Sequence, residues 1–167
     1  MLKNLDLNKV LFLDIETVAN VSDYDALDAG FMKLWNDKMK WQAERDNKTP
    51  AELYEKAGIY SEFAKIICIS VGYFTSANTP SVKYRTTSFA GDDEKELLQN
   101  FANLLNSYFT KNDQYLCAHN GKEFDYPFIA RRMLVNGVEL PDMLDLAGKK
   151  PWEIHHLDTM ELWKFGD

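Results

Sequence analysis

The hydrophobic residues of this chain recur with two different spacings, and the change of spacing separates expected strands from expected helices. Val10-Leu11-Phe12-Leu13 is an apolar run of strand length. Residues 66–74 are nearly all apolar, which is typical of a central strand covered on both faces. Alternation over residues 82–86 predicts a strand nearer the sheet edge, and residues 115–118 predict a further short strand.

Helical spacing is clearest around residue 100. An apolar stripe follows three acidic residues, which the helix dipole favours at a helix start; the stripe consists of Leu97, Leu98, Phe101, Leu104, Leu105 and Tyr108. A second helix is predicted from about Tyr126 until Asn136-Gly137 stops it. Residues 156–162 suit either a last strand or the start of a helix.

Residues 20–65 are predicted to be mainly helical. Leu27, Phe31, Leu34 and Trp35 recur at helical spacing. A second helix is indicated by residues 49–52, a capping-box pattern with proline at the first helical position, and Gly58 is placed to end it. The order of elements therefore predicts an α/β fold, a mixed sheet with flanking helices, as a single domain over residues 1–167 with a helical insert at about 20–65.

Composition and charge restrict the possible partners. The 167 residues are 46% hydrophobic and 27% charged, an ordinary globular composition. No apolar stretch is long enough to cross a bilayer, and the start lacks the apolar core of a signal peptide, so we expect a cytoplasmic protein without a membrane partner. The net charge of −7 argues against broad electrostatic capture of nucleic acid. It allows a nuclease in which bound metal ions attract the phosphates.

Several residues outside the apolar runs could contact a nucleic acid. The basic residues Arg131, Arg132, Lys149 and Lys150 could line its path, although solvated surface positions are the commoner role for such residues.

Cys68 and Cys117 each lie within an apolar run and are expected to be buried free thiols.

Asp14 and Glu16 are the first candidates for chemistry. They are two residues apart after the first apolar run, so on a strand both carboxylates point to one face. Two such carboxylates repel each other unless a cation joins them, which favours Mg²⁺ or Mn²⁺. Spacing alone is weak evidence, because similar acid pairs occur at Asp23/Asp25, Asp92/Glu94, Glu94/Glu96 and Glu123/Asp125.

Asp125 is the third candidate. An aspartate just before a first turn that contains proline is explained equally well as a helix N-cap. The catalytic role requires it to face Asp14 and Glu16. This is plausible if the strand at residues 115–118 lies beside the first strand, because the loop that follows would then open near Asp14.

Together these segments resemble a known family. Phe12-Leu13-Asp14-Ile15-Glu16-Thr17 resembles the first exonuclease motif of the DEDD superfamily, and Asn120-x-x-x-Phe124-Asp125-x-Pro127-Phe128-Ile129 resembles the second. Residues 61–70 are similar to the segment between the two motifs. The set is most similar to predicted 3′–5′ exonucleases related to the family B DNA polymerase proofreading domain.

The resemblance implies a ribonuclease-H-like fold and a two-metal phosphodiester hydrolase. Its substrate would be the 3′ end of single-stranded DNA or RNA, with DNA favoured. By matching position, Asp14 would contact both ions, Glu16 the ion that activates water, and Asp125 the other ion. Thr17 would contact the terminal nucleotide through its backbone, and Asn120 and Phe124 would position the strand, although Phe124 could equally be a core residue.

The chain departs from the family at the third motif, which supplies a fourth carboxylate and a tyrosine or histidine as general base. No tyrosine follows Tyr126, and His155 and His156 lack an aspartate at the required spacing. Asp158 resembles the aspartate that precedes this motif. We therefore expect a domain that is incomplete at its C-terminus, without its last helices, and weakly active or inactive as it stands. The alternatives are a non-catalytic ribonuclease-H-like module that binds nucleic acid, or a plain structural domain.

Overall fold

The computed structural model describes residues 4–77 and 79–166 and divides the chain into two compact units. One unit joins the chain up to Glu16 with the chain from Ile66 onward, and the other is Thr17–Lys65. The second unit covers nearly the same residues as the predicted helical insert. Each unit is described by itself below.

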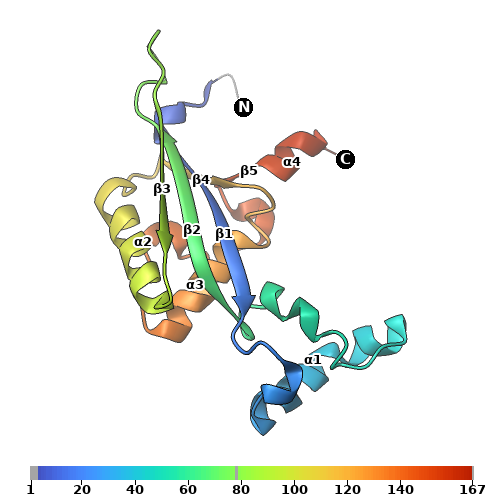
Figure 1. Cartoon of the computed structure of the whole chain (residues 1–167). Coiled ribbons are helices and arrows are strands. Elements are labelled where there is room, and N and C mark those ends of the chain that lie inside the picture. The colour runs from blue at the N-terminus through green and yellow to red at the C-terminus, as the bar shows by residue number, and fades with distance from the viewer. Residues whose placement is uncertain (1–3, 78, 167) are drawn as a thin grey trace. The chain divides into compact units, whose positions relative to one another are not determined.

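The first unit is built on a five-stranded sheet with the order β3-β2-β1-β4-β5 (Figure 1). Its strands are β1 (Val10–Ala19), β2 (Ala64–Phe74), β3 (Tyr84–Ala90), β4 (Tyr115–Ala118) and β5 (Leu157–Asp158). β1 is parallel to β4, with Phe12 opposite Cys117, and β4 is parallel to β5, with Ala118 opposite Asp158. β2 and β3 are antiparallel, so the sheet is mixed.

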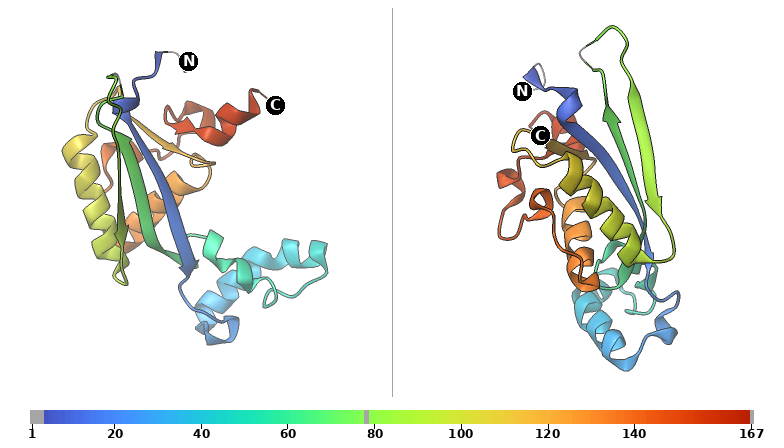
Figure 2. Two further views of the ribbon diagram at one scale, coloured as in Figure 1. Left: turned by 45° about the horizontal axis from the view of Figure 1, so that its top comes forward. Right: turned by 90° about the vertical axis from the view of Figure 1, so that its left-hand side faces the viewer.

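Two long helices, α2 (Glu94–Tyr108) and α3 (Asp125–Asn136), cover the same side of this sheet (Figure 2). Leu98, Phe101 and Leu105 of α2 are fully buried, and the Phe101 ring packs against Phe89 of β3. Gly137 ends α3 in the left-handed conformation, at φ 65°. The predicted α/β class, a mixed sheet with flanking helices, is confirmed. The prediction that Tyr108 belongs to the apolar stripe was wrong: Tyr108 is the last residue of α2 and is 73% exposed.

Residues 156–162 were predicted to form either a last strand or the start of a helix, and the structure has a short strand followed by a helix. Leu157 and Asp158 form β5, and α4 (Thr159–Lys164) begins directly after them. Asp158 caps this helix by accepting a hydrogen bond from the Met160 N–H at 2.9 Å. Among the described helices none is long and apolar enough to cross a membrane.

The second unit has its own core around Trp35 of α1 (Ala29–Asp46). The Trp35 ring is fully buried against Tyr54 and Phe63, and its N–H donates to the Pro50 carbonyl at 2.7 Å. The capping box at Thr49 and Glu52 forms as predicted. The helix expected after it is a 3₁₀ helix, η4 (Tyr54–Ile59), in which Gly58 lies inside the element rather than beyond its end.

Candidate active site

β1 presents Asp14 and Glu16 on one face of the sheet. Both side chains are exposed, whereas Leu13 and Ile15, which alternate with them, are buried. The strand continues to Ala19, so the two acids lie within β1 rather than at its end. β4 pairs with β1 only as far as Phe12, which leaves the edge of β1 beside Asp14 free of β4.

Asp125 is the first residue of α3, and its side chain is only 3% exposed. Phe124 occupies the cap position, and no side chain forms a hydrogen bond that caps this helix. Asp125 therefore does not act as the N-cap of α3, which was one of the two roles predicted for it. Instead the Oδ1 atom of Asp125 is buried without a hydrogen-bond partner. Burying an unpaired polar atom costs about 1–3 kcal/mol, so such an atom in a folded protein calls for an explanation.

The electrostatics of Asp125 connect it to β1. The pKa of the Asp125 carboxyl is raised to about 6. Burial is the largest cause, and the nearby negative charge of Asp14 is the next. The N–H groups of Asp125 and Ile15 act in the opposite direction. The fold thus brings Asp14 and Asp125, which are far apart in sequence, close enough for their charges to interact.

Glu16 lies exposed on β1, two residues beyond Asp14. Among the described residues, no group of three or more histidine, cysteine, aspartate or glutamate side chains is arranged to hold a metal ion. The site as folded is a carboxylate pair, Asp14 with Asp125, and Glu16 lies one pleat further along the same face of β1.

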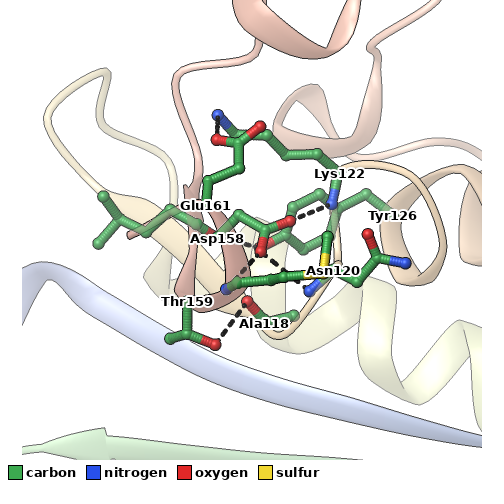
Figure 3. A network of polar contacts seen from close by, with 9 residues as sticks. Ala118, Asn120, Lys122, Tyr126, Asp158, Thr159 and Glu161 are labelled. Atoms are coloured by element: carbon green, nitrogen blue, oxygen red, sulfur yellow. Dashed lines mark hydrogen bonds and ion pairs between the residues drawn. The ribbon is translucent and has the colours of Figure 1, made fainter. Parts of the chain in front are cut away.

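Asp158 fixes the loop that leads from β4 to Asp125 (Figure 3). Its buried carboxylate accepts hydrogen bonds from the N–H groups of Asn120 at 2.9 Å and Lys122 at 3.2 Å, in addition to that of Met160. Asn120 has a left-handed backbone, φ 60°, a conformation that asparagine tolerates better than most residues. Asp158 is therefore a positioning residue for this loop, a role that the sequence did not indicate.

Asn120 also has a buried side-chain Oδ1 without a hydrogen-bond partner. It shares this feature with Asp125, the other predicted site residue at this end of β4. Phe124 is half-buried and its ring packs against Phe128 at a centroid distance of 5.3 Å. Thr17 belongs to the second unit, where its hydroxyl donates to the Gly58 carbonyl at 2.7 Å.

A comparison with protein families gives one match. A family model described as the RNase H superfamily matches residues 54–164. The matched segment contains β2 to β5, α2 and α3, and hence Asn120, Asp125 and Asp158. It begins after β1, which carries Asp14 and Glu16. A search of curated proteins gave no match.

Proposed function

The chain belongs to the RNase H superfamily, and from that membership we propose that it is a metal-dependent 3′–5′ exonuclease of the DEDD class. The superfamily indicates a nuclease or nucleic-acid-binding domain. The exonuclease class, the single-stranded 3′ end and the preference for DNA come from the resemblance of residues 12–17 and 120–129 to the exonuclease motifs.

The observation that carries the proposal is the carboxylate pair. Asp125 is buried, retains an Oδ1 atom without a partner and lies within electrostatic reach of Asp14. A divalent cation held by Asp14 and Asp125 would satisfy that atom and remove the repulsion between the two charges. Carboxylate oxygens are the ligands that Mg²⁺ and Mn²⁺ prefer. The residues present therefore fit such an ion, and Glu16 is the proposed third ligand.

In this proposal each residue has a defined task. Bound divalent ions supply a more acidic water molecule and stabilise charge on the leaving oxygen. Asp14, Glu16 and Asp125 would hold these ions. Asn120, whose Oδ1 is buried without a hydrogen-bond partner, is proposed to help position the strand. Asp158 keeps Asn120 and Lys122 in place by binding their backbone N–H groups. Phe124 is also proposed to position the strand, and the backbone of Thr17 is proposed to contact the terminal nucleotide.

The alternative is a module that binds nucleic acid without cleaving it. Among the described residues no group of three or more histidine, cysteine, aspartate or glutamate side chains is arranged to hold a metal ion, and a module of this kind would need none.

The proposal is tested by Mn²⁺ binding and by cleavage of single-stranded DNA labelled at its 5′ end. We expect Mn²⁺ to bind, and calorimetry to show more than about 100-fold weaker binding in Asp125→Asn, because even outer-shell partners of a metal contribute 10–100-fold. Glu123→Gln is the matched control: it removes one exposed acid two residues away and should bind Mn²⁺ as the unchanged protein does.

The cleavage assay separates the two candidates. An exonuclease shortens the labelled strand from its free 3′ end one nucleotide at a time, and Asp14→Ala abolishes the ladder of products without unfolding the protein. Cleavage that survives in Asp14→Ala would rule the mechanism out. Binding of DNA in EDTA with no cleavage in Mn²⁺ would support the non-catalytic module.

A further inference from the structure

A pocket of about 370 Å³ lies between α3 and the segment from Leu140 to Ile154, wholly within the first unit. Its size is in the range of small-molecule sites. Most of its wall is apolar, formed by Pro127, Ala130, Leu134, Leu140, Leu144 and Ile154 among others. In Figure 1 the helical wall is α3, drawn in orange.

The charged residues of the wall are all basic. Lys122, Arg131 and Lys149 line the pocket, and no aspartate or glutamate does, although the chain carries a net charge of −7. The ammonium group of Lys122 is neutralised by Glu161 at 2.7 Å. Arg131 and Lys149 take part in none of the ion pairs found between described residues. Two cations are thus available to an anionic ligand.

Both cations are attached to defined backbone. Arg131 lies in the middle of α3. Lys149 follows Gly148, whose φ of 77° makes a turn closed by the hydrogen bond from the Lys149 N–H to the Leu146 carbonyl at 3.0 Å. Basic side chains in the wall of an otherwise apolar pocket suit a ligand with an apolar ring and one anionic group.

We propose that this pocket binds a nucleoside monophosphate, with the base against the apolar wall and the phosphate between Arg131 and Lys149. The choice of a nucleotide rests on the proposed function, because hydrolysis at a 3′ end releases nucleoside 5′-monophosphates. The site itself does not use the carboxylate pair: neither Asp14 nor Asp125 lines it. Binding therefore requires no divalent ion.

The test is calorimetric titration in EDTA with three probes: adenosine 5′-monophosphate, adenosine and inorganic phosphate. We expect the monophosphate to bind at least about 10-fold more tightly than either fragment, because each fragment lacks one half of the contacts. Arg131→Ala and Lys149→Ala should each weaken monophosphate binding by about 10-fold, the usual size of one charge-assisted hydrogen bond.

Lys150→Ala is the matched control. It removes the same charge one residue away, but Lys150 does not line the pocket and its ammonium group lies over the Trp152 ring at 5.1 Å. The affinity should be unchanged. Equal losses in Lys149→Ala and Lys150→Ala would reduce the effect to general charge and overturn the site. Monophosphate binding no tighter than that of phosphate would overturn it as well.

The same titration in Asp125→Asn separates this inference from the exonuclease proposal. Monophosphate binding that persists in EDTA in this variant supports the pocket, whatever the outcome for Mn²⁺. Monophosphate binding that appears only with Mn²⁺ and disappears in Asp125→Asn belongs to the carboxylate pair. That result would refute the pocket while supporting the proposed function.

Discussion

Two buried carboxylates of the first unit, Glu94 and Asp125, have opposite surroundings. Glu94, 8% exposed, accepts hydrogen bonds from the Nε and Nη2 atoms of Arg132 at 2.9 and 2.6 Å. It also accepts from the Ile66 N–H at 2.7 Å and from the Asn136 side chain at 2.9 Å. Asp125, 3% exposed, keeps one oxygen without any partner.

Their pKa values diverge for this reason. Burial alone raises the pKa of Glu94, but the hydrogen bonds from Arg132, Ile66 and Asn136 outweigh it and lower the pKa below the usual value. At Asp125 burial and the charge of Asp14 act together and raise the pKa. Burial therefore does not by itself distinguish a structural acid from a functional one. The distinction lies in whether the protein supplies a partner for every buried oxygen.

Replacing Glu94 should give the largest loss of stability. Glu94→Ala leaves the Arg132 guanidinium buried without its carboxylate, which costs about 3–5 kcal/mol when a buried pair loses one member. Urea unfolding measures this loss. The control is Glu96→Ala, an exposed acid in the same first turn of α2, which should change the stability by less than about 0.5 kcal/mol. Similar small losses in both variants would show that Glu94 is not the structural member of the comparison.

Asp158 is a third buried carboxylate and should give an intermediate effect. Like Glu94 it is satisfied, but its donors are backbone N–H groups, those of Asn120, Lys122 and Met160. Asp158→Ala should lower the free energy of unfolding by about 1–3 kcal/mol, the cost of leaving buried donors without a partner. Hydrogen exchange provides a local measurement, because the amides of Asn120 and Lys122 should exchange faster while those of α2 do not. Unchanged exchange at both amides would contradict the positioning role.

The sequence predicted the bounds of helices and strands better than it predicted which side chains pair with each other. β4 has the bounds expected from its apolar run, and α3 ends at Asn136 because the glycine after it takes the left-handed conformation, both of which are local properties. The acids at the start of α2 were attributed to the helix dipole. Arg132 was predicted to lie either at the solvated surface or along a nucleic-acid path. Neither prediction for Arg132 was right, since its side chain is buried against Glu94. That pair joins two helices, so no local pattern reveals it.

Only part of the candidate site could be predicted from the sequence. The shared face of Asp14 and Glu16 followed from the two-residue period of a strand, and the observed exposure agrees with it. The missing partner of Asp125 and the three hydrogen bonds of Asp158 depend on the path of the loop between β4 and α3. Sequence spacing does not determine that path.

Asp125→Asn should change the free energy of unfolding by an amount that depends on pH. The pKa of Asp125 is about 6 in the folded protein against the ordinary value of 3.8, which applies to the unfolded chain, so between these values the folded state holds more protons. The unchanged protein therefore loses stability relative to Asp125→Asn as the pH rises from about 4 to 6, and the difference is constant above that range. Burial of His156 lowers the pKa of its imidazole to about 4, which gives the opposite slope, but it does so in both proteins and cancels in the difference.

Divalent metal should act against this difference by stabilising only the unchanged protein. At pH 7, Mn²⁺ at ten times its Kd stabilises a protein that binds it only when folded by about 1.4 kcal/mol. The unchanged protein should gain this amount and Asp125→Asn should gain none. Thermal unfolding at pH 4, 5, 6 and 7, with EDTA or Mn²⁺, measures both effects. A difference between the two proteins that does not vary with pH in EDTA would show that the Asp125 carboxyl is satisfied after all. The contrast with Glu94 would then disappear.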